Sequence, residues 1–123
     1  MKYLFDTNIF IAQLVNDPKA VEFFSPFFLS QNDIVTSQIV RMELLSYPGI
    51  TLRSEIIIKL LLDEFEVISI DDNIEREAIN LRRNFKIKLP DAIIAATSIV
   101  EKAELVTFNT KDFTKIKELK LYK

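Results

Sequence analysis

The stretch Leu4–Phe10 reads LFDTNIF and places three polar residues in a row between two apolar segments. Lys2–Phe5 has the length and apolar character of a short buried strand, and Asn8–Leu14 is predicted to form a helix. A strand that ends directly in an acid has two explanations. Either Asp6 caps the following helix, for which Asp is a favoured residue, or the strand delivers its carboxylate into a functional site.

Strand and helix patterns alternate along the rest of the chain. Further strands are predicted at Asp33–Thr36, Glu66–Ile70, Leu105–Phe108 and, as a fifth strand, Leu119–Tyr122. A helix is predicted from Pro18 to Phe24, with Pro26 interrupting or ending it. Further helices are predicted over Ser37–Leu45, Leu52–Phe65 and Leu89–Val100. Another helix is capped by Asp71 or Asp72 and includes Ile74, Ala78 and Leu81. This alternation favours the α/β class, with a mainly parallel central sheet of four to five strands flanked by helices, in a single domain spanning residues 1–123.

Polar residues follow two of these strands at the same edge of the predicted sheet. Asp6 follows the first strand, and Asn109 and Asp112 follow Leu105–Phe108. Ligands of parallel sheets bind beyond the carboxyl ends of the strands, so the sequence predicts a site at this edge. Thr107 either orients a carboxylate or a water there, or bonds the backbone as Thr does in turns.

The composition limits the chemistry of such a site. The chain has no Cys and no His, which excludes zinc sites built on these residues, thiol nucleophiles and triads that use imidazole. Carboxylates, hydroxyls, amides, Lys and Arg remain, and sites made of carboxylates alone suit Mg²⁺ or Mn²⁺. The formal net charge of −2 gives no overall attraction to a polyanion, so a nucleic-acid partner must be held by a local patch.

The composition also indicates where the protein works. Apolar residues make up 49% of the chain, enough for a core, and no apolar run approaches the roughly 20 residues that span a bilayer. The N-terminus has no basic segment followed by a small-residue cleavage site. We therefore expect a cytoplasmic protein with no membrane partner.

Two acids in predicted helices have competing interpretations. Glu43 shares a stripe with Ile39, Val40 and Tyr47, where an unpaired carboxylate is costly to bury. It is either a site residue or an exposed Glu on an amphipathic helix of different phase. Asp91 follows a proline in the first turn of its helix, where the helix dipole favours negative charge, so it also has a local explanation.

The residues before Asp91 are basic, although the chain as a whole is acidic. The stretch contains Arg82, Arg83, Phe85, Lys86 and Lys88. A cationic stretch with an aromatic residue, running directly into a carboxylate, suits a phosphate backbone bound beside a metal ion. The alternative is a solvated helix end, which is the more frequent role of a charge run.

Three segments together resemble the PIN-domain ribonucleases. They are LFDTNIF (Leu4–Phe10), TSQIVRMELLS (Thr36–Ser46) and LPDAIIAATSIVEKAELVTFNTKDF (Leu89–Phe113). The chain is especially similar to the small VapC-type toxins of prokaryotic toxin–antitoxin pairs, and the resemblance covers essentially its whole length. Its most specific parts are the Asp-Thr-Asn after the first strand and the helix start Asp-Ala-Ile-Ile-Ala-Ala. The resemblance implies a PIN-like three-layer α/β sandwich.

The resemblance also implies an activity. It implies a divalent-metal-dependent endoribonuclease that uses Mg²⁺ or Mn²⁺ to hydrolyse phosphodiester bonds, leaving 5′-phosphate and 3′-hydroxyl ends. Asp6, Glu43 and Asp91 match the three core acids of the family. The position of the fourth acid is Asn109 here, which is a departure, and Asp112 lies one helical turn further on.

These matches predict the roles of the site residues. The predicted metal ligands are Asp6, Glu43, Asp91 and Asn109. The predicted catalytic residues are Asp6, Glu43, Asp91 and Asp112, with Thr7, Asn8 and Thr107 supporting them and Arg82, Arg83, Lys86 and Lys88 binding RNA. The metal would lower the pKa of the attacking water and stabilise the transition state, which removes the need for a histidine base.

Two apolar clusters and the resemblance together predict protein partners. The clusters are Phe23–Phe28 and Ile56–Leu62, and they hold more large side chains than one buried helix face needs. They are either core or interface, and we expect a homodimer and a groove for a cognate antitoxin. The alternatives for the whole chain are a catalytically silent PIN-like module that binds RNA or protein, a phosphoaccepting receiver domain, and a DNA-directed nuclease of the same fold.

Overall fold

The computed structural model describes residues 1–123. Its strands are β1 (Lys2–Phe5), β2 (Asp33–Ser37), β3 (Glu66–Ile68) and β4 (Glu104–Val106). Its helices are α1 (Thr7–Leu14), the 3-10 helix η1 (Pro18–Phe24), α2 (Pro26–Gln31), α3 (Gln38–Leu45), α4 (Leu52–Leu62), α5 (Asp72–Asn84), α6 (Leu89–Val100) and α7 (Thr110–Phe113). None of the helices has the length and apolar character that crossing a membrane requires.

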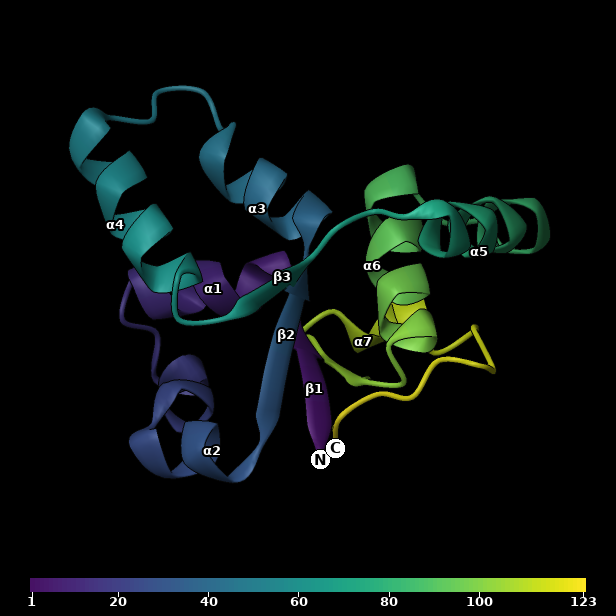
Figure 1. The fold of residues 1–123 in the computed structure, drawn as a ribbon, viewed down its shortest axis with the longest axis horizontal. Helices are drawn as coiled ribbons and strands as arrows, with labels where there is room; N and C mark the ends of the chain where they lie inside the picture. The colour runs from purple at the N-terminus through teal and green to yellow at the C-terminus, as the bar shows by residue number, and fades with distance from the viewer.

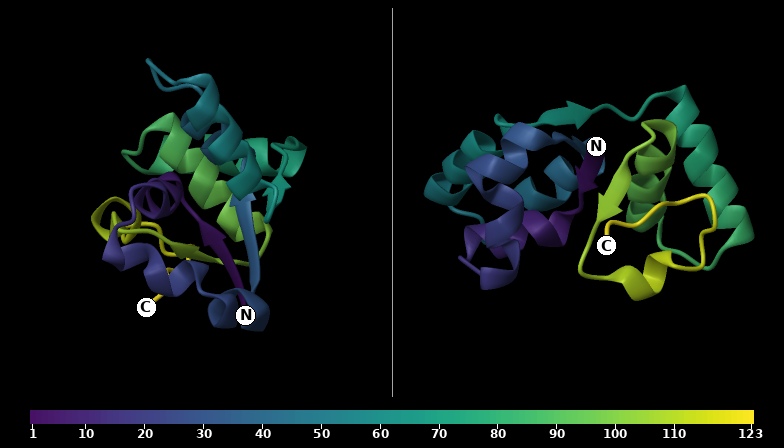
Figure 2. Two further views of the ribbon diagram at one scale, coloured as in Figure 1. Left: turned by 90° about the vertical axis from the view of Figure 1, so that its left-hand side faces the viewer. Right: turned by 90° about the horizontal axis from the view of Figure 1, so that it is seen from below.

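The strands form one parallel sheet in the order β3-β2-β1-β4. Leu4 of β1 pairs with Val35 of β2 and with Leu105 of β4, so the three strands end at the same edge. Helices α1, α2 and α4 lie on one side of the sheet and α5 and α6 on the other (Figure 1), with α5 packed against α6 (Figure 2). The predicted α/β three-layer sandwich with a parallel sheet is confirmed.

The predicted fifth strand is wrong. Its residues contribute a single parallel bridge, between Leu121 and Leu105, along the free edge of β4. The backbone bonds of this segment to β4 are two, from the N–H of Leu105 to the carbonyl of Lys120 and from the N–H of Tyr122 to the carbonyl of Leu105. The chain end therefore covers the edge of the sheet without extending it.

Several element ends differ from the prediction. Pro18–Phe24 is a 3-10 helix, and Pro26 begins a new helix rather than only ending the one before it, because Ser25 caps α2 through the N–H of Phe28. Helix α4 ends earlier than predicted. Strand β4 ends at Val106, since the chain then turns into α7.

Phe5 of β1 lies at the centre of the core. Its ring centroid lies 5.3 to 6.5 Å from those of Phe10, Phe23, Phe24, Phe28 and Phe65. Aromatic pairs of this kind stabilise a core beyond the area they bury. Of the predicted phenylalanine cluster, Phe27 alone points away from the core and is 76% exposed. The cluster is therefore mainly core.

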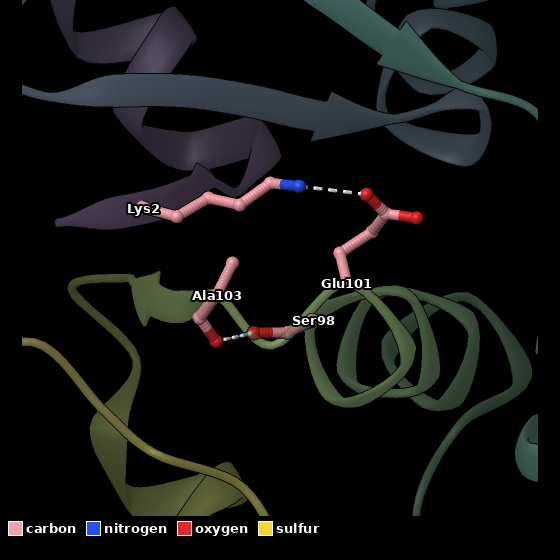
Figure 3. Close-up of polar contacts among 4 residues, drawn as sticks. All are labelled: Lys2, Ser98, Glu101 and Ala103. Atoms are coloured by element: carbon pink, nitrogen blue, oxygen red, sulfur yellow. Dashed lines mark hydrogen bonds and ion pairs between the residues drawn. The ribbon is translucent and has the colours of Figure 1, made fainter.

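The turn from α6 to β4 is held at two points (Figure 3). The hydroxyl of Ser98 donates to the carbonyl oxygen of Ala103 at 2.6 Å, and Nζ of Lys2 pairs with Oε1 of Glu101 at 2.9 Å. The hydrogen bond from Lys2 to Glu101 raises the pKa of Lys2 above its usual value. These contacts fasten β4 beside β1, which brings the residues that follow the two strands together.

Candidate active site

Asp6 stands at the carboxyl end of β1 and is only 4% exposed. Its Oδ1 accepts a hydrogen bond from the N–H of Ile9 at 3.2 Å, so Asp6 is the N-cap of α1. Its Oδ2 accepts a hydrogen bond from the hydroxyl of Thr107 at 2.5 Å. The capping interpretation of Asp6 is correct, and its second oxygen is held at the end of the neighbouring strand.

Burial raises the pKa of Asp6 from 3.8 to about 6. Hydrogen bonds from Thr107 and from the backbone of Ile9 and Asn8 lower the pKa, whereas the charge of Asp91 raises it. Thr107 itself accepts a hydrogen bond from the N–H of Asn109 at 3.0 Å. The hydroxyl of Thr107 therefore orients the carboxylate of Asp6 and also fixes the first residues after β4.

Glu43 on α3 faces the same edge of the sheet. Its Oε1 accepts a hydrogen bond of 2.6 Å from the hydroxyl of Thr7, the first residue of α1. Glu43 is half-buried, while Val40 and Leu44 on the same helix are buried. The alternative that Glu43 is an exposed residue on an amphipathic helix of different phase is wrong, since Glu43 is half-buried.

Asp91 lies in the first turn of α6 and is half-buried. Burial raises its pKa above the usual value, the charges of Asp112 and Glu43 raise it further, and the charge of Lys88 lowers it. The acids of three different elements are thus close enough to repel one another. Such mutual repulsion disfavours the ionised forms unless a cation is present.

All four predicted metal ligands line one cavity of about 310 Å³ at the carboxyl edge of the sheet. The predicted ligands there are Asp6, Glu43, Asp91 and Asn109, accompanied by the predicted supporting residues Thr7 and Asn8. No Lys or Arg lines this cavity. As the side chains stand, however, no three acids are grouped closely enough to hold a metal ion. The cavity offers oxygen donors that suit a hard cation, but it does not hold them around one point.

Asn109 and Asp112 contact each other. The amide nitrogen of Asn109 donates to Oδ2 of Asp112 at 2.8 Å. The carbonyl oxygen of the Asn109 side chain is therefore the group that can face a cation, as a neutral ligand. Asp112 does not line the acid cavity and belongs instead to a neighbouring one.

This second cavity is basic and shares Asp91 with the first. It contains three of the four predicted RNA-binding residues, Arg82, Lys86 and Lys88. Arg83 does not line it, although Arg83 is adjacent to Arg82 in the sequence. Lys115, from the segment after α7, does line it and carries no sequence signal of its own. Only the folded chain reveals that Lys115 lies there.

The acids that a receiver domain would use have another role. Oδ1 of Asp71 accepts a hydrogen bond from the N–H of Ile74 at 2.9 Å and caps α5. Neither Asp71 nor Asp72 lines the acid cavity. The strand β3 before them is at the edge of the sheet, away from β4. The geometry therefore gives no support to a phosphoacceptor site.

Comparison with protein families gives one match, to the PIN domain, over residues 3–119. No curated protein sequence matches the chain significantly. Among solved structures, a toxin–antitoxin complex from Klebsiella pneumoniae contains a chain that is 37% identical, with a TM-score of 0.74 and coverage of 95% of this chain and 94% of that one.

Two further solved structures share the fold over nearly the whole chain. A chain of VapBC2 from Rickettsia felis, solved with a DNA fragment from its promoter, is 27% identical with a TM-score of 0.87, covering 99% of this chain and 98% of that one. A chain of VapBC-1 from nontypeable Haemophilus influenzae is also 27% identical, with a TM-score of 0.81 and coverage of 99% and 97%.

Proposed function

This chain belongs to the PIN domain family, and on that premise we propose that it is a divalent-metal-dependent endoribonuclease acting as the toxin of a toxin–antitoxin pair. The observation that carries the proposal is the single cavity lined by Asp6, Glu43, Asp91 and Asn109. The similarity to a chain of the Klebsiella toxin–antitoxin complex supports the toxin role. The choice of RNA as substrate rests on the resemblance of the motifs to the ribonucleases of the family.

The donor set fits Mg²⁺ or Mn²⁺, because every predicted ligand offers oxygen. Asp6, Glu43 and Asp91 would hold the ion with charged oxygens and Asn109 with a neutral one. When bound, the ion supplies a water of lowered pKa and positive charge opposite the phosphoryl group. Thr107 and Thr7 each donate a hydrogen bond to a ligand, which fixes the carboxylate and leaves lone pairs free for ligation.

The repulsion among the acids also favours a cation. The pKa of Asp6 and that of Asp91 are both raised, so the ionised form of each carboxyl is destabilised when no counter-charge is present. Because no three acids are grouped as they stand, ligation includes side-chain rotation toward the ion. Glu43 has the longest side chain of the three and the greatest rotational freedom.

The test is cleavage of a mixed RNA pool by the purified chain, freed of antitoxin, with Mg²⁺, with Mn²⁺ and with EDTA. We expect cleavage that requires the metal and is lost in Asp6→Asn, Glu43→Gln and Asp91→Asn. Glu118→Gln is the matched control, because Glu118 is an exposed acid that lines no cavity, and it should cleave normally. A pool of single-stranded DNA run beside the RNA distinguishes a DNA-directed nuclease.

A catalytically silent module is the second candidate function. It is favoured by Asn109, which brings no charge, and by the absence of a group of three converged acids. It predicts no cleavage in either metal, together with no heat of Mg²⁺ or Mn²⁺ binding in calorimetry. Cleavage that survives in all three acid variants would contradict both candidates and point to a contaminating nuclease.

An apolar groove of about 490 Å³ between α1, α3 and α4 suits an antitoxin. It shares Ile11 and Glu43 with the acid cavity, so a segment bound in it lies beside the active site. We assign the groove to an apolar segment of the antitoxin encoded next to this gene, in keeping with the toxin–antitoxin complexes that contain similar chains.

The test of the groove is the affinity for that antitoxin. Ile57→Asp, in the groove, should weaken binding by tenfold or more, in keeping with an apolar anchor worth on the order of 2 kcal/mol. Val21→Asp is the control, since Val21 is also an exposed apolar residue, at 63% against 47% for Ile57, but lies outside the groove. Equal losses in the two variants would show that the antitoxin binds elsewhere.

A homodimer would use the outer face of α4. Leu52, Ile56 and Leu60 follow one another at four-residue intervals and are 50 to 74% exposed, which gives an apolar stripe outside the groove. A two-fold axis places such a stripe against its own copy. We expect a dimeric mass in light scattering at micromolar concentration and a monomeric mass for Ile56→Glu. A monomeric mass for the unmodified chain would contradict the dimer.

A further inference from the structure

The basic cavity beside the acid cavity has a volume of about 440 Å³. Its lining residues are Arg82, Lys86, Ile87, Lys88, Asp91, Asp112 and Lys115. Four cations against two acids give this cavity a positive charge, although the chain as a whole carries a net charge of −2. A cluster of cations in a concave site attracts an anion that the rest of the surface repels.

We propose that this cavity is a phosphate subsite, which binds a backbone phosphate of the RNA next to the phosphate that is cleaved, and that Lys115 positions the substrate there. The inference rests on the proposed function, since it takes the acid cavity as the place of cleavage. It extends that function in two ways. It gives the direction in which the RNA backbone runs from the acid cavity, and it assigns a role to Lys115, which no sequence motif marks.

The first support is the contact that Lys115 makes. Lys115 lies beyond α7, and its Nζ donates a hydrogen bond to the backbone carbonyl of Lys86, in the segment that joins α5 to α6. This contact joins two segments that are far apart in sequence. It places the ammonium group of Lys115 beside Lys86 in the lining of the basic cavity. An ammonium group has three N–H donors, so two remain for a phosphate.

The second support is the position of the cavity relative to the acids. Asp91 lines both cavities, and Asp112 links them through its hydrogen bond with Asn109. A polyanion laid across Asp91 thus has one phosphate at the acids and the next among the cations. This arrangement lets the cations hold the backbone without occupying the site of cleavage.

The third support is that the structure divides the basic stretch that the sequence presents as one. Arg82 lines the cavity and Arg83 does not. Adjacent residues on an α-helix point in directions about 100° apart, so Arg82 and Arg83 at the end of α5 lie on different faces of the helix. The subsite is therefore a specific set of side chains rather than a general basic surface.

The first experiment measures binding without cleavage. A fluorescent single-stranded RNA oligonucleotide is titrated with the full chain in EDTA, and the Kd is read from anisotropy at several salt concentrations. We expect Lys115→Gln and Arg82→Gln to raise Kd about threefold to fivefold each, as for exposed charge pairs. The slope of log K against log salt should fall in magnitude by about 0.7 in each variant, because one phosphate contact is lost.

The matched control is Lys117→Gln. Lys117 lies two residues from Lys115, is exposed and lines no cavity, so its variant has the same charge change and should alter Kd by less than about twofold. Arg83→Gln should have a smaller effect than Arg82→Gln. If Lys117→Gln weakened binding as much as Lys115→Gln, the subsite would be refuted in favour of a diffuse basic surface. Lys115→Arg should have the Kd of the wild type, since it keeps the positive charge at this position.

The second experiment separates the subsite from the proposed function. With Mg²⁺ present, Lys115→Gln should raise KM about threefold to fivefold while kcat stays within about twofold, because the contact binds ground and transition state alike. Cleavage by the wild type with an unchanged KM in Lys115→Gln would overturn the subsite and leave the nuclease standing. No cleavage by the wild type, with the Kd differences intact, would overturn the nuclease and leave an RNA-phosphate site.

Discussion

Asp6→Asn is expected to stabilise the metal-free protein at neutral pH, although it removes a predicted metal ligand. The pKa of the Asp6 carboxyl is raised to about 6 in the folded chain, chiefly by burial. The folded state therefore binds a proton at Asp6 more tightly than the unfolded state does. Because of this, the contribution of Asp6 to stability is fully present below about pH 4 and is lost as the pH rises through about 6.

The size of the effect follows from the shift. A change in pKa from 3.8 to about 6 corresponds to about 3 kcal/mol of unfolding free energy lost by the wild type between about pH 4 and about pH 7. Asn has no charge to bury and avoids this loss. It retains an oxygen for the N–H of Ile9, but the hydroxyl of Thr107 loses its carboxylate acceptor, which costs about 1 kcal/mol. The net gain of the variant is about 2 kcal/mol at about pH 8.

The assay is urea unfolding of the wild type and of Asp6→Asn in EDTA, at about pH 4 and at about pH 8. The variant should be the more stable of the two at the higher pH, and equal or about 1 kcal/mol less stable at the lower pH. Comparing the two chains at each pH cancels the titration of the groups that do not interact with Asp6. A difference between them that does not change with pH would refute the assignment of a buried, destabilised carboxylate to Asp6.

Further predictions concern the metal, the hydroxyl beside Asp6 and the core. Mg²⁺ at about 10 mM should raise the Tm of the wild type, because an ion bound with Kd of about 1 mM stabilises the fold by on the order of 1 kcal/mol. The Tm of Asp91→Asn should not rise with Mg²⁺. A rise equal to that of the wild type would exclude Asp91 as a ligand. Thr107→Val removes a hydrogen bond that lowers the pKa of Asp6, so the pH–rate profile of cleavage should move to higher pH, and an unmoved profile would show that Thr107 does not act on Asp6. Ser98→Ala should cost about 1 kcal/mol in urea unfolding, since it leaves the carbonyl of Ala103 without its side-chain donor. The Kd for RNA should not change, because neither Ser98 nor Ala103 lines the acid cavity or the basic cavity. Phe5→Ala should cost about 3 to 5 kcal/mol, as for a large aromatic side chain removed from a packed core, and a loss below about 1 kcal/mol would contradict the packing of the five rings around it.

The order and type of the main elements could be predicted from the sequence because local patterns decide them. Short apolar runs mark the strands, and an Asp before a periodic apolar run marks a helix start, as at Asp6 and Asp71. The edge at which the acids gather also followed, since the carboxyl ends of parallel strands meet. The fifth strand failed because pairing of a short terminal segment depends on what its neighbours leave uncovered.

The sequence by itself determined the chemistry that is available: a chain without His or Cys, with acids in the order of the PIN motifs, is limited to carboxylates, hydroxyls, amides, Lys and Arg. Only the tertiary structure decided which side chains act together. Thr107 contacts Asp6, 101 positions away in the sequence, because β4 lies beside β1. Lys115 lines the basic cavity, and Arg83 does not, because the segment after α7 folds back onto Lys86. Contacts of this kind are set by strand order and by packing of distant segments, which leave no local signature in a sequence.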